Sequence, residues 1–312
     1  MYLTSNAVVF PGQGSQYPLM LEDYFNNESD FNNVFIESSE ILGVDLINLI
    51  TSGSEEDLSK TEITQPLMLV ADLALWSLLS PIISQPTYLA GHSLGEYSAL
   101  VASKVLTLKD ALRLVVARST LMQNAVPEGK GAIAAVIGLD ETAVTEICNK
   151  ISLKKGYLVN KANLNTPLQL VISGTSLGVN KAIEECKKVG AKKAIHLKMS
   201  VPAHSELMIS ASKEFSKIIE EVEFRNPTIP IIHNVDVSVS SSNKGIKIKL
   251  IEQIYKPVRW VETIQKISEK RVNTVIECGP NKVLTSLIKR IDQKLQVIDL
   301  DKYSNYLNLK NA

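Results

Sequence analysis

The sequence predicts an α/β protein with a mainly parallel sheet and a smaller inserted subdomain. Through most of the chain, short apolar runs alternate with helix-like segments, which is typical of a parallel sheet. Within 128–198 the order becomes strand, helix, strand, strand, helix, strand, the pattern of a ferredoxin-like unit. We therefore expect a discontinuous large subdomain, formed by residues 1–127 and 199–312, and a small subdomain at 128–198.

The first half of the large subdomain contains two expected strands that each lead into a glycine-containing turn. Residues 7–10 (AVVF) are stopped by PGQGSQ, and residues 88–90 (YLA) run into GHSLG and a helix expected over 96–103. Between them, an apolar segment at 67–79 predicts a buried helix with Pro66 near its first turn. Both turns are candidates for a functional site.

The remaining elements follow from the same patterns. In the small subdomain we expect strands at 132–137, 157–162, 168–173 and 194–197, and helices at 140–150 and 176–189. Beyond it we expect helices over 205–222, 246–255, 260–270 and 282–294, with strands near 229–234 and at 274–277. Residues 301–312 are polar and are expected to be loosely held.

The charge and cysteine content argue against several classes of function. The chain has 33 basic and 33 acidic residues, so no net field attracts it to nucleic acid or an anionic membrane. The apolar run at 67–79 is too short to span a bilayer. Cys148, Cys186 and Cys278 form no CxxC pair, which disfavours a disulfide framework or a zinc site and fits a reducing cytoplasm. No coiled coil or exposed apolar stripe is evident, so we expect a monomer.

The strongest catalytic signal is a GxSxG motif, Gly91-His92-Ser93-Leu94-Gly95, between an expected strand and helix. The two glycines permit a sharp turn that lifts the serine hydroxyl from the sheet edge. The following helix directs its free N–H groups to the same point, so the Leu94 N–H could stabilise an oxyanion beside Ser93. The alternative is an incidental serine in a glycine-rich turn.

A serine nucleophile needs a base, and the sequence contains four histidines. His92 adjoins the serine and is expected to point elsewhere. His196 lies within an alternating strand of the small subdomain, where a surface position is expected. His204 follows a proline-containing loop and His233 ends a strand, and both positions suit catalysis. These patterns favour His204 and leave His233 as the second candidate.

Arg118 is out of place in an apolar helix face. In the helix expected over 109–124, steps of about 100° per residue put this arginine in the middle of the apolar side. A buried guanidinium needs an anionic partner because its charge is costly to desolvate alone. That partner is either an internal carboxylate or an anionic substrate, and the sequence pattern favours neither.

Together these motifs resemble the malonyl-CoA:acyl carrier protein transacylases of bacterial fatty-acid synthesis. The matching segments, which cover nearly the whole chain, are FPGQGSQ from Phe10, TQP from Thr64, GHSLGEYSA from Gly91, Arg118, NLN from Asn163, VPAHS from Val201 and QIYKPV from Gln253. GxSxG alone occurs in many hydrolases, but this ordered set is specific to acyltransferases of fatty-acid and polyketide synthesis. One departure is Asn281, where relatives often have glycine.

The resemblance implies an α/β-hydrolase-like large subdomain, a ferredoxin-like small subdomain and a set of catalytic roles. It implies that Ser93 attacks the malonyl thioester and that His204 is the general base. A backbone carbonyl near Gln253, instead of an acidic side chain, would support the histidine. The backbone N–H groups of Gln13 and Leu94 would hold the oxyanion.

The resemblance also implies the substrate contacts. Arg118 would bind the free malonyl carboxylate through its two-pronged donor face, and Gln65 would line the acyl pocket. We expect Asn163 and Asn165, on the central turn of the small subdomain, to face the acyl group and help to keep water from it.

The implied reaction has two half-reactions in ping-pong order. Malonyl-CoA would acylate the serine and release CoA, and the phosphopantetheine thiol of acyl carrier protein would then remove the malonyl group. No metal or redox cofactor is implied. The alternatives are a trans-acting acyltransferase of a polyketide synthase, a serine esterase or thioesterase, and a degenerate acyl-binding protein.

Overall fold

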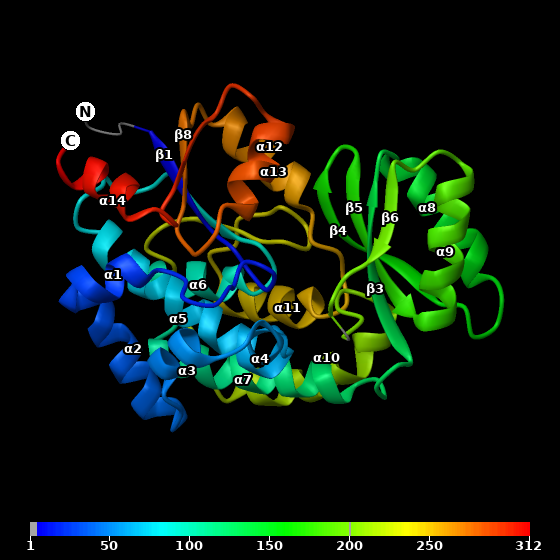
Figure 1. The fold of residues 1–312 in the computed structure, drawn as a ribbon, viewed down its shortest axis with the longest axis horizontal. Helices are drawn as coiled ribbons and strands as arrows, with labels where there is room; N and C mark the ends of the chain where they lie inside the picture. Colours follow the sequence, from blue (N-terminus) through cyan, green and yellow to red (C-terminus); the bar gives the residue numbers. More distant parts are fainter. Residues whose placement is uncertain (1–4, 200) are drawn as a thin grey trace.

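The structure is a computed structural model that describes residues 5–199 and 201–312, and it contains two sheets. Sheet A lies in the larger part of the molecule and sheet B in the smaller part (Figure 1). The strands of sheet A are β1 (Asn6–Phe10), β2 (Tyr88–Gly91), β7 (Ile231–Ile232), β8 (Thr274–Glu277) and β9 (Gln296–Asp299). The strands of sheet B are β3 (Gly131–Ile137), β4 (Val159–Thr166), β5 (Gln169–Thr175) and β6 (Lys193–His196).

Sheet A is parallel in every pairing and has the order β7-β2-β1-β8-β9. The register places Phe10 of β1 opposite Gly91 of β2, and Val9 opposite Glu277 of β8. The chain therefore leaves β1 and β2 side by side at the carboxyl edge of the sheet, which is where parallel α/β sheets bind ligands.

Helices cover both faces of sheet A. Their bounds are α1 (Glu22–Asn27), α2 (Ser29–Leu42), α3 (Leu46–Ser52), α4 (Glu55–Ser59), α5 (Thr61–Leu79), α6 (Gly95–Ala102), α7 (Leu108–Asn124), α10 (Ile209–Glu220), α11 (Asn243–Gln253), α12 (Trp260–Glu269), α13 (Val283–Ile291) and α14 (Tyr303–Lys310), with a short 3-10 turn at Glu206–Met208. Successive residues of β1 point to opposite faces. Val8 and Phe10 belong to the core that holds α5, α6 and α7, whereas Ala7 and Val9 pack with α12 and α13.

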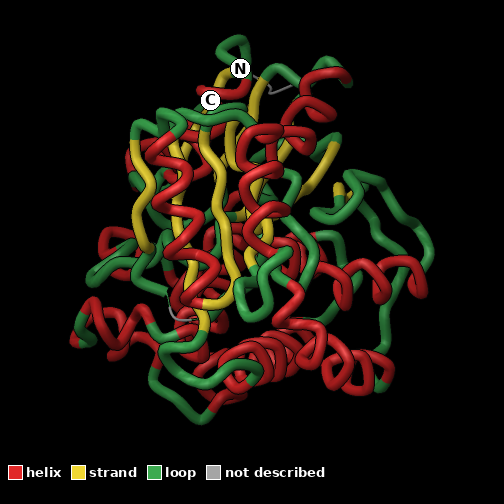
Figure 2. Tube along the Cα trace, turned by 90° about the vertical axis from the view of Figure 1, so that its right-hand side faces the viewer, coloured by secondary structure: helices red, strands yellow, loops and turns green. Residues whose placement is uncertain are grey.

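Sheet B is antiparallel, with the order β4-β5-β3-β6, and confirms the predicted ferredoxin-like pattern. The helices α8 (Glu141–Ser152) and α9 (Ser176–Lys188) lie across its outer face, as Figure 2 shows. On the other face, Ile133, Ala162 and Val171 form a small apolar cluster with Leu197 and Met199. All four strands fall within residues 131–196.

Helix α5 starts earlier than predicted. It begins at Thr61, so Pro66 is its sixth residue, where the missing N–H removes only the bond to the Glu62 carbonyl. Of the described helices, α5 alone has the length and hydropathy of a membrane span, so the argument that this segment is too short was wrong. Of its most apolar 18-residue stretch, 78% is buried, so the helix belongs to the protein core.

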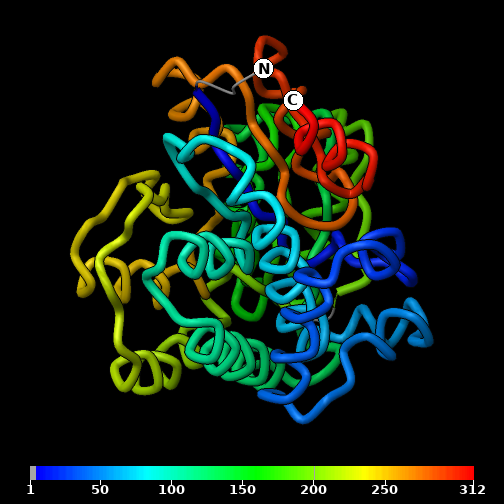
Figure 3. The backbone as a smooth tube through the Cα atoms, turned by 90° about the vertical axis from the view of Figure 1, so that its left-hand side faces the viewer, coloured from blue at the N-terminus to red at the C-terminus, as the bar shows by residue number. Residues whose placement is uncertain are grey.

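The prediction of a loosely held C-terminus is also wrong. Helix α14 lies near α1 (Figure 3). The rings of Tyr303 and Tyr306 in α14 lie 5.0 and 5.8 Å from the ring of Tyr24 in α1. The Tyr24 hydroxyl donates a 2.7 Å hydrogen bond to the Leu300 carbonyl. Tyrosines three residues apart share one helix face, so an otherwise polar segment still has an apolar side.

Asn281 occupies the loop between β8 and α13 in a left-handed conformation, with φ of 64°. Asparagine adopts this conformation more readily than most residues with a side chain, so it can replace glycine here at modest cost. Its backbone N–H donates a 2.6 Å hydrogen bond to the Asp301 carboxylate, which links the loop to the C-terminal segment.

Candidate active site

Ser93 lies at the sharp turn between β2 and α6, as the GxSxG pattern predicts. Its φ of 53° is left-handed and strained for a residue with a side chain. The turn is too tight for larger residues, because a Cβ on Gly91 would lie 1.9 Å from the carbonyl carbon of Gly95. The Ser93 N–H donates to the Asn234 side-chain oxygen at 2.7 Å, and the Asn234 amide donates to the Gly91 carbonyl at 2.6 Å. Asn234 therefore holds both ends of the strained turn.

His204 lies beside the serine hydroxyl. The distance from Ser93 Oγ to His204 Nε2 is 2.8 Å. On the other side of the ring, Nδ1 lies 2.7 Å from the Gln253 carbonyl oxygen and 3.1 Å from that of Lys256. Because carbonyl oxygens only accept, these contacts assign the ring proton to Nδ1 and leave Nε2 as the acceptor for the serine proton.

The surroundings of His204 favour its neutral form. Burial and, to a lesser extent, the nearby Arg118 guanidinium lower the pKa of His204 to about 3. Both effects disfavour a positive charge on the ring. A neutral imidazole is the form that can take a proton from Ser93, so the site holds a base ready for use at neutral pH.

Arg118 extends from α7 into the same site and is 1% exposed. Its Nη1 donates to Gln65 Oε1 at 2.6 Å, and its Nη2 donates to Ser93 Oγ at 3.0 Å and to Gln253 Oε1 at 3.1 Å. Within the described part of the chain, no carboxylate lies within ion-pair distance of this guanidinium, so an internal salt bridge is not its partner. Its hydrogen-bond partners are neutral, and the Glu96 carboxylate acts on it electrostatically from behind Gln253. The guanidinium can therefore still pair directly with an anionic ligand.

The other three histidines are held elsewhere. His92 Nε2 lies 2.9 Å from the Asn165 side-chain oxygen, and burial lowers the pKa of His92. His196 is exposed, as expected, and contacts Asn180. His233 is fully buried, with Nδ1 2.7 Å from a Glu96 carboxylate oxygen. The structure thus brings His204, and not His233, to the serine.

A cavity of about 150 Å³ joins these groups and lies between the two parts of the molecule. Sheet B and the segment after it contribute apolar side chains together with Asn163 and Asn165. The larger part contributes the serine, the histidine and the arginine. The cavity is lined by the predicted residues Gln13, Gln65, Ser93, Leu94, Arg118, Asn163, Asn165 and His204, and by the apolar Ile133, Val171, Leu197 and Met199. The sequence-predicted site residues therefore converge on one cavity, except that Gln253 lies just behind it.

The backbone N–H groups of Gln13 and Leu94 are available at this cavity. Neither donates a hydrogen bond to another residue in the described ranges. The loop that carries Gln13 packs closely on the serine turn, since a Cβ on Gly12 would lie 2.5 Å from the His92 carbonyl oxygen. Two free backbone donors beside a serine hydroxyl suit the stabilisation of an oxyanion.

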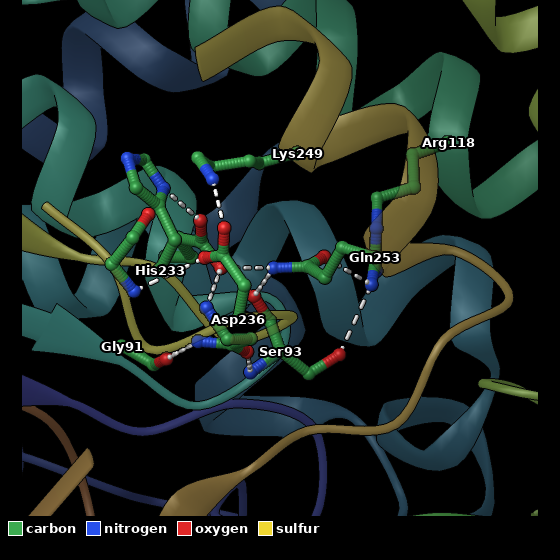
Figure 4. Close-up of polar contacts among 10 residues, drawn as sticks. Gly91, Ser93, Arg118, His233, Asp236, Lys249 and Gln253 are labelled. Carbon is green, nitrogen blue, oxygen red and sulfur yellow. Dashed lines mark hydrogen bonds and ion pairs between the residues drawn. The ribbon is translucent and has the colours of Figure 1, made fainter. Parts of the chain in front are cut away.

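Two functional residues escaped the sequence analysis, Glu96 and Asn234. Glu96 is buried in the first turn of α6 and accepts from the Gln253 side-chain amide at 2.7 Å and from the Asn234 N–H at 3.2 Å. Figure 4 shows Gln253, Arg118 and Ser93 directed toward one another beside this network. The available signals were that Glu96 follows the GxSxG motif directly and that Asn234 adjoins a candidate histidine.

The chemistry open to this arrangement is covalent transfer of an acyl group with an anionic end. It combines a hydroxyl, a neutral base in contact with it, two backbone donors and a guanidinium that, among the described residues, has no direct ion pair. Across the part of the chain that the structure describes, no three His, Cys, Asp or Glu side chains gather as a metal site.

Comparisons with known proteins agree on one kind of relative. The acyl transferase domain family matches residues 7–300. A malonyl CoA-acyl carrier protein transacylase of Haemophilus influenzae is 42% identical over 302 residues, which is 96% of each chain. The solved transacylase of the same name from Coxiella burnetii is 40% identical, with a TM-score of 0.96 over 100% of this chain and 99% of that one. A malonyl-transacylase solved in complex with a type II polyketide acyl-carrier protein is 41% identical, with a TM-score of 0.96 over 99% and 100%.

Proposed function

We propose that this chain, which belongs to the malonyl-CoA–acyl carrier protein transacylase family of acyl transferases, moves a malonyl group from malonyl-CoA to the phosphopantetheine thiol of an acyl carrier protein. One observation carries the proposal. Ser93 Oγ contacts both a neutral base, His204, and a buried guanidinium, Arg118, that bonds directly to no carboxylate in the described part of the chain. Membership of the family indicates which substrates are used, and this contact indicates how the acyl group is transferred.

In the first half-reaction, Ser93 Oγ attacks the thioester carbonyl carbon of malonyl-CoA as its proton passes to His204 Nε2. The N–H groups of Gln13 and Leu94 stabilise the oxyanion of the tetrahedral intermediate. When the C–S bond breaks, the CoA sulfur takes the proton from His204 and leaves as a thiol. The enzyme is left as a malonyl ester of Ser93.

In the second half-reaction, the carrier-protein thiol gives its proton to His204 and attacks the ester carbonyl. The C–O bond to Ser93 breaks, and the serine oxygen recovers a proton from the histidine. Atoms and charges balance with these groups alone, so we propose a mechanism that uses no metal or redox cofactor.

Arg118 gives the reason for a malonyl substrate. Its Nη2 donates to Ser93 Oγ, which is a weak partner that a malonyl carboxylate can replace. Gln65 and Gln253 hold the guanidinium from the other side with neutral oxygens. An acetyl group has no carboxylate, so it would leave a buried charge without an anionic partner, and its binding would be weaker.

The surroundings of the acyl group come from the small part of the molecule. We propose that residues 128–198 act as a separate subdomain that closes one wall of the cavity. Asn163 and Asn165 line this wall, and Asn165 accepts a hydrogen bond from His92 if the His92 ring proton is on Nε2. Both would help to exclude water from the malonyl-serine ester until the thiol arrives.

We propose the acyl carrier protein of fatty-acid synthesis as the acceptor and the cytoplasm as the location. The curated relatives carry the transacylase name, which favours this acceptor over the polyketide alternative. A solved malonyl-transacylase with the same fold binds a polyketide carrier protein, so the acceptor is testable with the two carriers side by side. A serine esterase is disfavoured, because it has no use for a buried arginine held by neutral side chains at the nucleophile.

The test is intact-mass analysis after brief mixing with malonyl-CoA or acetyl-CoA. We expect a malonyl adduct on the wild type and none on Ser93→Ala. Arg118→Ala should lose malonyl loading while retaining acetyl loading. Arg113→Ala is the matched control, because Arg113 lies on the exposed side of the same helix. Equal loading of the wild type by both thioesters, or no adduct at all, would refute the proposal.

A further inference from the structure

Glu96 is a buried carboxylate three residues beyond the nucleophile, and it contacts no atom that would touch substrate. It is 0% exposed. Its Oε1 lies 2.7 Å from His233 Nδ1, and its Oε2 accepts from the Gln253 side-chain amide at 2.7 Å and from the Asn234 N–H at 3.2 Å. Both oxygens of this carboxylate are therefore used, one by the His233 ring and the other by Gln253 and Asn234.

Glu96 fixes which way the Gln253 side chain faces. The carboxylate of Glu96 can only accept a hydrogen bond, and the guanidinium of Arg118 can only donate one. Gln253 lies between them, so its nitrogen must face Glu96 and its oxygen must face Arg118. The observed distances, 2.7 Å and 3.1 Å, match this one orientation. The second amide hydrogen of Gln253 is also used, since it donates to the Ser93 carbonyl at 2.9 Å.

We propose that Glu96 is a positioning residue for malonyl selectivity: through Gln253 it sets the place of the Arg118 guanidinium beside Ser93. This inference rests on the proposed function, in which Arg118 binds the malonyl carboxylate. Without Glu96, only the Ser93 carbonyl would hold the Gln253 nitrogen, so the amide could rotate and turn its nitrogen toward Arg118, where two donors would face each other. The guanidinium would then lose one of the two side-chain amide oxygens that hold it.

A second buried acid shows that burial alone does not create this arrangement. Asp72 of α5 is also 0% exposed, but its carboxyl receives one side-chain hydrogen bond, from Ser98, and its Oδ1 has no partner in the described part of the chain. Burial raises the pKa of Asp72 well above its usual range. Asp72 contacts neither Gln253 nor Arg118, so it provides a control for the removal of a buried acid.

The experiment compares malonyl and acetyl loading of Ser93, measured by intact mass against time, in Glu96→Ala and in Asp72→Ala. In Glu96→Ala, a misplaced guanidinium should lower the malonyl loading rate by roughly 10- to 100-fold, since a shift of about 1 Å at a positioning group has effects of this size. Acetyl loading should fall by less than about threefold, because acetyl makes no bond to Arg118. The malonyl-to-acetyl ratio of Asp72→Ala should match the wild type.

Two further variants separate positioning from a structural role. In Glu96→Gln, the new amide oxygen can still accept from Gln253 if His233 moves its ring proton to Nε2, so most of the lost selectivity should return. In an Arg118→Ala background, Glu96→Ala should cause no additional change in the ratio. A loss of folded protein would reduce both thioesters equally and would leave the ratio unchanged.

The outcomes are distinct. A wild type that forms no malonyl adduct contradicts the proposed function itself. A selective wild type with an unchanged ratio in Glu96→Ala overturns only this inference. Should Glu96→Ala fail to fold, Gln253→Ala replaces it, because that variant keeps the backbone carbonyl that holds His204. The same selective loss is then expected, and an unchanged ratio would overturn the inference.

Discussion

The two buried histidines near Ser93 have opposite surroundings. His204 has Nε2 on the serine hydroxyl and Nδ1 on two backbone carbonyls, so all its partners are neutral. His233 has Nδ1 on the Glu96 carboxylate, and its Nε2 is buried with no partner among the described residues. In Ser-His-Asp enzymes the acid supports the catalytic base, whereas here the buried acid supports the other histidine.

In a Ser-His-Asp triad the acid both fixes the position of the ring proton and stabilises the protonated ring. The different partners of His204 and His233 separate these two tasks. A carbonyl is enough to fix the ring proton of His204 on Nδ1, but it stabilises the protonated ring less than a carboxylate does. The pKa of His204 therefore stays low, as burial and Arg118 require. Glu96 is left to hold Gln253 and Asn234, the residues that position Arg118 and Ser93.

The largest expected effect comes from replacing each histidine in turn. His204→Ala should lower the malonyl loading rate at least about a thousandfold, because it removes the one base that contacts the serine among the described residues. His233→Ala should lower it by less than about tenfold, since that ring acts only through Glu96. The rates are measured by quenched-flow intact mass. Similar losses in both variants would break the distinction drawn between the two rings.

His233→Ala should instead show its effect on stability. Removing the donor leaves one buried oxygen of Glu96 without its partner, which costs about 1–3 kcal/mol in the free energy of unfolding. Denaturant unfolding of the variant and the wild type measures this difference. His196→Ala is the matched control, because His196 is exposed and should change stability by less than about 0.5 kcal/mol.

The parts of this site that the sequence predicted are those that local pattern encodes. Ser93 follows from glycines two positions away on either side, between a strand and a helix. Arg118 follows from helical periodicity, which places it on the buried face of α7, as the structure confirms. In both cases the pattern that predicts the residue lies in the same turn or the same helix as the residue itself.

The choice between His204 and His233 needed more than local pattern. The proline-containing loop before His204 favoured it, but a histidine at a strand end also suits catalysis, so His233 stayed as the second candidate. What separates them is the distance to Ser93, which depends on how α11 brings the Gln253 carbonyl to His204. Glu96 escaped notice for a related reason: a glutamate in the first turn of a helix is favoured locally by the helix dipole, which hides its tertiary role.

The helices and the strand that the sequence did not predict were missed because contacts with distant residues place them. Residues 301–312 look polar in sequence, and α14 is held by contacts of Tyr303 and Tyr306 with Tyr24, which lies far away in the sequence. The strand β9 is short and pairs only with β8, so little in its own sequence marks it. Helices α1, α2 and α3 were not predicted, and they too are placed by packing on the core around α5.

An intermediate effect is expected at Asn234, which links the two histidine regions. Its side chain holds the Ser93 N–H and the Gly91 carbonyl, while its own N–H donates to Glu96. Asn234→Ala keeps the backbone bond to Glu96 and releases the strained turn. Loading by malonyl and acetyl should therefore fall together, by roughly tenfold, because the nucleophile is displaced for both. A loss confined to malonyl would show that Asn234 acts through Arg118 instead.

The smallest effect concerns the pH at which His204 gains a proton. Because its pKa lies below the ordinary value of 6.5, the ring stays neutral well into the acid range, and the rate of Ser93 acylation should fall only as the pH drops far below 6.5. Arg118→Met removes the positive charge that lowers this pKa. The acid limb of the pH profile, where the rate of Ser93 acylation falls at low pH, should therefore move to higher pH. It should remain below 6.5, because burial is the larger cause and is unchanged.

Acylation by p-nitrophenyl acetate measures this shift, since the neutral ester does not depend on the guanidinium for binding. Arg113→Met lies on the exposed side of the same helix and should leave the limb in place. A wild-type limb at or above 6.5 would mean that an anion stabilises the protonated ring after all. The contrast between His204 with neutral partners and His233 with the carboxylate would then fail, because the charge of Glu96 would reach both rings.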